Sequence, residues 1–270
     1  MISGTTRVAG LIGGSTAHSL SPFIHNFLAS AMGIDAVYAT FDVSPEGLEM
    51  AVSGAYVLGF AGLNVTAPYK TAVIRHTTEL ENDAKIIQAV NLLKWEDYGF
   101  YGYNTDIYGI LATLKHHGMV RLTRATILGA GGAARAGVAA LANLGCRHLS
   151  LINRTKSSAQ ALSSLAQSRY NMETEIVTAP TSGDIFIQAT SQTPLELENV
   201  LPKKYNMVFD MNYPRQNPWL GSIDAVTLDG ISMLIFQAIA GFEIMWNVKV
   251  PLKIISELTI SIENYLDKEN

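Results

Sequence analysis

The sequence predicts an α/β protein of two domains, each with its own sheet. Strand-like and helix-like segments alternate along most of the chain, which is typical of sheets covered by helices. A glycine-rich turn between a strand and a helix begins at Gly129. The chain has 270 residues and is 48% hydrophobic, so it can bury two cores. We expect residues 1–105 and 231–270 to form one domain and residues 106–230 the other.

The first block alternates β-branched or aromatic runs with capped helical segments. Helix starts are indicated by Ser21-Pro22 and by Pro45, and Gly33 is a typical helix end. A pair of apolar runs over 91–104 predicts a hairpin that turns near Asp97. The expected strands lie at 6–14, 36–43 and 62–68, and the expected helices at 21–33 and 44–54, with further helical material from Lys70 to about Gln88. Alternation of this kind favours a largely parallel sheet.

The second block repeats the alternation and then ends in helices. We expect a helix near 106–118 to connect the two blocks, since no flexible linker is visible. The expected strands lie at 124–128, 148–154, 174–179, 184–190 and 206–212. The expected helices lie at 132–145, 156–170, 231–247 and 252–266, the last with apolar residues three and four apart.

Composition excludes several functional classes. The net charge is −4 with no run of Lys or Arg, so we expect no nucleic-acid partner. Cys146 is the single cysteine and the six histidines are scattered, so neither a disulfide framework nor a metal site is expected. No secretory signal pattern is visible, so we expect a cytoplasmic protein. The apolar segment 231–248 is short for a membrane span and contains Gln237 and Glu243, so we expect a helix buried between the domains.

The glycine turn predicts a dinucleotide site. Gly129 permits a tight turn, Gly131 lets the backbone approach a pyrophosphate, and Ala134 allows close helix packing. The helix start then offers free amides and a positive dipole end to the phosphates. An ordinary glycine turn in an α/β fold is the alternative.

The end of the next expected strand indicates which dinucleotide binds. An NAD site usually has an acidic residue there, whereas this chain has Asn153, Arg154, Thr155 and Lys156. Arg154 can stack on adenine and pair with a 2′-phosphate, and Thr155 can donate to the same group. The sequence therefore favours NADP over NAD, with a solvated surface arginine as the alternative.

Small polar side chains gather at the expected strand ends and helix starts of the first hundred residues. They are Ser19, Ser21, Asn64, Thr66, Lys70, Asn91, Asn104, Thr105 and Asp106. Some have a simpler explanation, because Ser21, Thr105 or Asp106 could serve as a helix cap without binding a ligand. Open α/β sheets bind ligands at their strand ends, so the recurrence favours a polar substrate site.

The motifs, in their order, resemble the shikimate dehydrogenase family over about residues 10–240. They read Ser-x-Ser-Pro-x-x-His-Asn, Asn-Val-Thr-x-Pro-x-Lys, Ala-Val-Asn, Asn-Thr-Asp, Gly-Ala-Gly-Gly-Ala-Ala-Arg and Asn-Arg-Thr. The resemblance implies reversible NADP-linked reduction of 3-dehydroshikimate to shikimate, on the route to chorismate and the aromatic amino acids. It makes residues 1–105 with 231–270 the substrate-binding catalytic domain and 106–230 the NADP-binding domain, around a cleft.

The resemblance also implies residue roles. Lys70 and Asp106 would be the catalytic acid-base pair. Substrate would be bound by Ser19, Ser21, Asn64, Thr66, Lys70, Asn91, Asp106, Tyr213 and Gln237. Cofactor would be bound by Gly129, Ala130, Gly131, Gly132, Ala133, Asn153, Arg154, Thr155, Lys156, Thr190, Gly230 and Met233. The chemistry agrees, since reduction of a ketone leaves an alkoxide that a lysine can stabilise and protonate.

Three positions depart from the family pattern. Gln188 stands where the family usually has asparagine, and the glycine that follows in the family is absent, so the contacts of this loop with the cofactor are in doubt. Asn217 stands where threonine is common.

Two rival functions remain for this sequence. They are a paralogue that also oxidises quinate, often with NAD, and a nucleotide-binding regulator without catalysis. A monomer and a homodimer are both compatible with the sequence.

Overall fold

The computed structural model describes residues 2–190, 204–213, 220 and 223–269. The chain divides into two compact units, Met1–Thr105 with Gln237–Asn270, and Asp106–Phe236. The later crossing lies inside the helix α7 (Ile231–Trp246), a few residues after the expected boundary at 231. The chain passes from the second unit to the first within one continuous helix. No linker therefore marks this boundary in the sequence.

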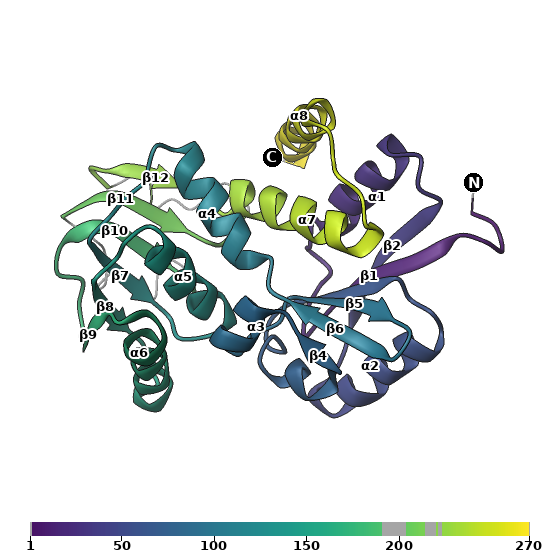
Figure 1. Cartoon of the computed structure of the whole chain (residues 1–270). Coiled ribbons are helices and arrows are strands. Elements are labelled where there is room, and N and C mark those ends of the chain that lie inside the picture. Colours follow the sequence, from purple (N-terminus) through teal and green to yellow (C-terminus); the bar gives the residue numbers. More distant parts are fainter. Residues whose placement is uncertain (1, 191–203, 214–219, 221–222, 270) are drawn as a thin grey trace. The chain divides into compact units, whose positions relative to one another are not determined.

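The first unit contains a six-stranded sheet in the order β2-β1-β3-β5-β6-β4 (Figure 1). Its strands are β1 (Arg7–Gly13), β2 (Ala36–Asp42), β3 (Gly62–Val65), β4 (Glu79–Leu80), β5 (Leu92–Glu96) and β6 (Gly99–Tyr103). The parallel pairing that alternation predicted is confirmed for β1 with β2 and with β3. The predicted hairpin is also confirmed, because β5 and β6 pair antiparallel from Leu92 opposite Tyr103 to Glu96 opposite Gly99. All four residues of β3 are buried, as expected for a central strand.

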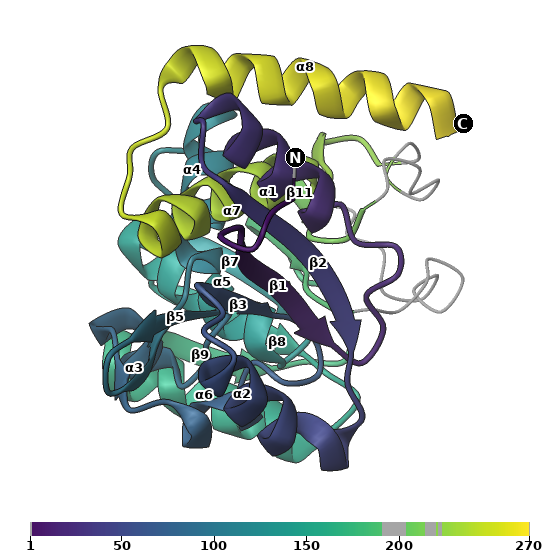
Figure 2. The ribbon, with the colours of Figure 1, turned by 90° about the vertical axis from the view of Figure 1, so that its right-hand side faces the viewer.

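The helices of this unit come from both the N-terminal and the C-terminal parts of the chain. They are α1 (Ser21–Ala31), the 3-10 turn η1 (Pro45–Gly47), α2 (Leu48–Val57), the 3-10 turn η2 (Ala72–His76), α3 (Asn82–Ile87) and the C-terminal α8 (Leu252–Glu269). The last of these lies beside α1 (Figure 2), where the Phe23 and Tyr265 rings meet at 5.0 Å. The core under β3 and β5 includes the fully buried Leu63 and Leu93.

The prediction of helical material from Lys70 to about Gln88 was only partly right, because a strand interrupts it. This segment forms η2, then β4, then the short helix α3. The Thr77 hydroxyl donates to the Ile74 carbonyl at 2.7 Å, and the Thr78 amide donates to the Phe100 carbonyl at 2.9 Å. Pairing with β6, which is distant in sequence, thus overrides the local helical pattern at two β-branched residues.

The second unit is a six-stranded parallel sheet in the order β12-β11-β10-β7-β8-β9 (Figure 1). Its strands are β7 (Arg124–Leu128), β8 (His148–Ile152), β9 (Glu173–Ile176), β10 (Gly183–Gln188), β11 (Tyr205–Asp210) and β12 (Val226–Leu228). Its helices are α4 (Asp106–His116), α5 (Gly132–Asn143), α6 (Lys156–Tyr170) and the start of α7. The short strand β12 was not predicted, since three residues carry too little periodicity. No helix in the described ranges is long and apolar enough to span a bilayer.

Candidate active site

Asn91 is the centre of a buried polar cluster in the first unit. It directly precedes β5 and is 3% exposed. Its Oδ1 accepts the Thr105 amide N–H at 2.7 Å, and its Nδ2 donates to Thr105 Oγ1 at 3.0 Å and to Gln237 Oε1 at 3.4 Å. One amide side chain therefore joins the start of β5, the residue that precedes α4, and α7.

Asn64 extends this cluster from β3. Its Oδ1 accepts the Tyr38 hydroxyl at 2.9 Å, and its Nδ2 donates to the Asn91 carbonyl at 3.3 Å. Gly241 of α7 faces the same place, because a Cβ there would lie 3.6 Å from Asn64 Nδ2 and 3.8 Å from Thr105 Oγ1. The structure thus brings three predicted substrate residues together, namely Asn64, Asn91 and Gln237.

The backbone of Lys70, and that of the residue before Asp106, are bonded to the same short segment. The Lys70 carbonyl accepts the Val90 amide at 2.7 Å. Asp106 is buried, begins α4, and follows Thr105, whose amide is held by the Asn91 side chain. Residues 90 and 91 therefore fix the chain at Lys70 and at the peptide that leads into Asp106.

The two serines lie at the start of α1. Ser19 Oγ donates to Ser21 Oγ at 3.1 Å and accepts the Ser21 amide at 3.2 Å. The N-cap residue is Leu20, and no side chain caps the helix. The alternative explanation of Ser21 as a helix cap was therefore wrong, because Ser21 is already the first helical residue. The Ser21 amide itself donates to Ser19 Oγ, two residues earlier.

Thr66 follows β3 at the end of the parallel strands. Its amide donates to the Ile12 carbonyl at 3.0 Å. A Cβ at Gly13 would lie 2.4 Å from Thr66 Cγ2, so only glycine permits this approach of β1 to the threonine. The glycine thus keeps Thr66 beside the end of β1.

Tyr38 and His25 were not predicted to be functional. His25 is 2% exposed, and its ring stacks on the Tyr38 ring at 4.2 Å and 7°. Burial lowers the pKa of His25 to about 3. Neither ring nitrogen has a hydrogen-bond partner among the described residues. His25 stood inside a motif, but a lone histidine on an apolar helix face carries no signal of function.

The glycine turn of the second unit has the shape that phosphate binding requires. Gly129 has φ +115°, and a Cβ there would lie 3.0 Å from the Ala189 carbonyl oxygen. Gly131 is the N-cap of α5 and has open space around a would-be Cβ, whereas Ala134 is fully buried. The amides of Gly132 and its neighbours at the helix start can therefore approach an anion closely.

The predicted adenosine-side residues follow β8. Arg154, Thr155 and Lys156 are exposed, and Asn153 Nδ2 donates to the Thr155 carbonyl at 2.8 Å. Thr155 is the N-cap of α6, but its side chain makes no capping hydrogen bond. Two cations and one hydroxyl thus stand together at this helix start, without an acidic residue, and this set suits a phosphorylated ribose.

Gln188, which departs from the family pattern, forms hydrogen bonds that close the turn to Thr190. Gln188 is fully buried; its Oε1 accepts the Thr190 amide at 2.8 Å and the Thr190 hydroxyl at 3.0 Å, and its Nε2 donates to the Thr190 carbonyl at 3.2 Å. The longer side chain therefore helps to hold Thr190, whose carbonyl also accepts a hydrogen bond from Asn212 Nδ2 at 2.8 Å. Residues 191–194 and Asn217 lie outside the described residues.

Gly230, Met233 and Tyr213 complete the predicted set. The Gly230 amide donates to the Asn212 carbonyl at 3.0 Å, and a Cβ at Gly230 would lie 2.4 Å from the Met211 carbonyl oxygen. Glycine is thus required for the close approach of the chain before α7 to the end of β11. Met233 is buried in α7, and Tyr213 is half-buried.

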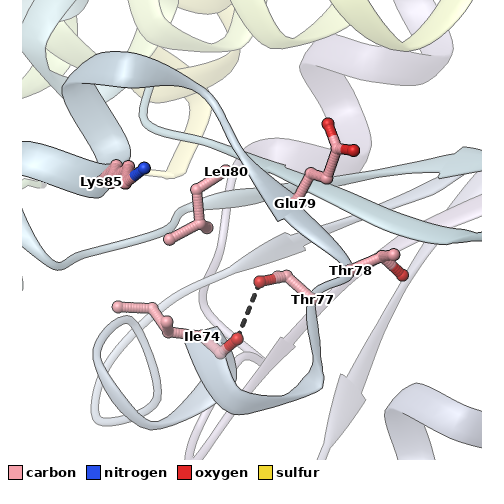
Figure 3. Close-up of a pocket in the computed structure, with 6 residues that line it drawn as sticks. All are labelled: Ile74, Thr77, Thr78, Glu79, Leu80 and Lys85. Atoms are coloured by element: carbon pink, nitrogen blue, oxygen red, sulfur yellow. Dashed lines mark hydrogen bonds between the residues drawn. The ribbon is translucent and has the colours of Figure 1, made fainter.

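A separate hollow of about 440 Å³ opens in the first unit between η2, β4 and α3 (Figure 3). Its lining residues are Ile74, Thr77, Thr78, Glu79, Leu80 and Lys85. None of them is a predicted site residue, and the buried polar cluster around Asn91 contributes nothing to it. We therefore assign the candidate site to the polar cluster rather than to this hollow.

Known proteins resemble this chain over nearly its whole length. Residues 11–93 match the shikimate dehydrogenase substrate binding domain, and residues 111–231 match the family described as shikimate / quinate 5-dehydrogenase. The shikimate dehydrogenase (NADP(+)) of Methanothermobacter thermautotrophicus is 34% identical, over 95% of this chain and 97% of the relative. A solved shikimate dehydrogenase in complex with NADP+ is 32% identical, with a TM-score of 0.83 and 97% of both chains covered. The shikimate 5-dehydrogenase of Listeria monocytogenes, solved with shikimate and NAD, is 28% identical, with a TM-score of 0.81, over 96% of this chain and 98% of the other.

Proposed function

This chain belongs to the shikimate dehydrogenase family, and from that premise we propose that Lys70 and Asp106 are the acid-base pair of an NADP-dependent shikimate dehydrogenase. The reaction interconverts 3-dehydroshikimate and shikimate, in the pathway to chorismate and the aromatic amino acids. NADPH supplies the two-electron reduction when it is bound.

One observation carries the assignment of the pair. The Lys70 carbonyl is bonded to the Val90 amide, and the residue before Asp106 is bonded to the Asn91 side chain. Neighbouring residues of one segment thus hold the backbone beside both side chains. Such anchoring restrains the two groups before substrate arrives, which is what positioned acid-base catalysis needs.

The roles follow from the charges of the two groups. An ammonium at Lys70 stabilises negative charge that develops on the substrate oxygen and can deliver a proton to it. A carboxylate at Asp106 can accept a hydrogen bond from the substrate hydroxyl. In the oxidising direction the same groups receive the hydroxyl proton.

We assign the remaining polar residues of the first unit to substrate binding. The hydroxyls of Ser19 and Ser21 are neutral donors suited to the substrate carboxylate, and the cluster of Asn64, Asn91 and Gln237 suits its ring oxygens. A buried polar group left unpaired costs roughly 1–3 kcal/mol, so a ligand lacking one hydroxyl should be rejected. We include Thr66 and Tyr213 in the same set.

We assign the second unit to NADP. The amides after Gly129 would hold the pyrophosphate at the start of α5, and Arg154 with Thr155 would hold the 2′-phosphate. The remaining cofactor residues in this proposal are Ala130, Gly131, Gly132, Ala133, Asn153, Lys156, Thr190, Gly230 and Met233.

The Lys70→Ala variant tests the function. We expect the reduction of NADP by shikimate to slow at least ~100-fold, while NADPH binding, followed by its fluorescence, stays at the wild-type value. Lys85→Ala is the matched control, because this exposed lysine lies in the same unit and lines the separate hollow. Wild-type turnover in Lys70→Ala would remove Lys70 from the mechanism.

A quinate-oxidising enzyme is the second candidate, since one matching family is described as shikimate / quinate 5-dehydrogenase. Values of kcat/KM for shikimate and quinate, each with NADP and with NAD, separate the two. The cations at Arg154 and Lys156 favour NADP over NAD. A preference for quinate with NAD would replace our assignment by the second.

A further inference from the structure

The direction of the hydrogen bonds at Asn64 is set by a backbone carbonyl. The Asn91 carbonyl can only accept, so the atom of Asn64 that faces it must be the amide nitrogen. The amide oxygen must then face Tyr38, and the Tyr38 hydroxyl must donate to it at 2.9 Å. Together these two contacts leave the Asn64 amide a single orientation.

That orientation leaves one N–H of Asn64 for a ligand. One hydrogen of Nδ2 is directed at the Asn91 carbonyl, and the second pairs with no residue that the structure describes. Gly241 lies close by, since a Cβ built there would be 3.6 Å from Nδ2. The cluster therefore presents a donor, not an acceptor, at this position.

Tyr38 is in turn held by two consecutive residues of α1. The Asn26 side chain clamps its backbone, donating to the Tyr38 carbonyl and accepting the Tyr38 amide, both at 2.9 Å. The His25 ring stacks on the Tyr38 ring at 4.2 Å. The His-Asn pair that follows Ser-Pro in the first motif thus fixes the phenol in place.

We propose that Tyr38 is a positioning residue, which holds the Asn64 amide in this orientation so that its second N–H binds a hydroxyl or keto oxygen of the substrate. The proposal rests on the proposed function, because it names how one residue of that substrate site is oriented. His25 and Asn26 act one step further out, by holding Tyr38. The site then recognises an oxygen that accepts a hydrogen bond at this position, and a substrate that lacks this oxygen is selected against.

A double-mutant cycle with Tyr38→Phe and Asn64→Ala tests the proposal. Tyr38→Phe keeps the ring and its stacking but removes the donor, so we expect the KM for shikimate to rise about tenfold while the KM for NADP stays unchanged. Since Tyr38 acts through Asn64, Tyr38→Phe should have no further effect in the Asn64→Ala background. Additive effects, or a wild-type KM in Tyr38→Phe, would overturn the proposal.

Tyr56→Phe is the matched control for a lost tyrosine hydroxyl. The Tyr56 hydroxyl donates to the Asp97 carbonyl at 2.8 Å in the same unit, outside the polar cluster. We expect this variant to lower stability slightly and to leave both KM values unchanged. A similar rise in the KM for shikimate in Tyr56→Phe would mean that general loosening explains the effect, and would overturn the proposal.

A spectroscopic arm separates this proposal from the proposed function. The side-chain amide signals of Asn64, assigned by their loss in Asn64→Ala, should shift in the 15N spectrum of ligand-free Tyr38→Phe. Unchanged signals would overturn the orientation by Tyr38. If the wild type failed to oxidise shikimate while these signals shifted, the proposed function would fail and the orientation would stand.

Discussion

Replacing His25 by phenylalanine should make the protein less sensitive to acid. The phenyl ring can keep the stacking on Tyr38, and it removes two ring nitrogens that have no hydrogen-bond partner among the described residues. Burying an unpaired polar group is costly, so the His25→Phe variant should be as stable as the wild type at pH 7, or more stable.

The magnitude follows from the pKa of His25, which burial lowers from 6.5 to about 3. Between these two values the unfolded chain binds a proton that the folded chain does not bind, so stability falls as the pH falls. The contribution is fully present above pH 6.5 and is lost progressively towards pH 3. Between pH 7 and pH 5 the loss from this one group is about 2 kcal/mol.

Urea unfolding at pH 7 and at pH 5 measures this loss. Tryptophan fluorescence is a suitable probe, because Trp95 and Trp246 belong to the same unit as His25. The wild type should lose about 2 kcal/mol more than His25→Phe between the two pH values, and the exposed His18→Gln control should follow the wild type. An equal loss in wild type and His25→Phe would refute the reasoning.

Arg154→Ala should weaken NADPH binding at least about tenfold and NADH binding much less, because both cofactors lose the stacking on adenine but only NADPH loses the pairing with the 2′-phosphate; fluorescence titration with both cofactors checks this, and an equal loss for both would contradict it. Gly230→Ala should destabilise the protein by about 1–3 kcal/mol, since its Cβ would lie 2.4 Å from the Met211 carbonyl oxygen, whereas Gly54→Ala, with nothing within 4 Å, is the thermal-unfolding control. Cys146 is 1% exposed, and burial raises its pKa to about 11, so the folded protein should not react with Ellman's reagent at pH 8 until denaturant is added; fast labelling without denaturant would refute this.

The sequence predicted the elements whose signals are local. Residues typical of helix starts and ends predicted α1, α5 and α6, and continuous apolar runs predicted the central strands β3 and β7. The prediction for the segment after Lys70 was only partly right because this segment pairs with β6. That pairing is a long-range contact, which no local sequence pattern indicates. The strand β12 was missed because three residues carry too little periodicity, and it is defined by its pairing with β11.

The candidate site was predictable in its members but not in its connections. Asn64, Asn91 and Gln237 could be named from motifs, yet their hydrogen bonds to one another depend on the fold. Tyr38 was unpredictable because a tyrosine in a strand is ordinarily a packing residue. Its role becomes visible only through the carbonyl of Asn91, which dictates the direction of the neighbouring amide.

The clamp of α1 on β2 has an evolutionary consequence. His25 and Asn26 hold Tyr38, and the first turn of the same helix carries Ser21. A drift of this helix would displace a serine hydroxyl and an asparagine amide at once, so substitutions at positions 25, 26, 38 and 64 should be inherited together across related enzymes. A lineage that lacks the phenol should also show a changed His-Asn pair and a different preference among cyclic polyols.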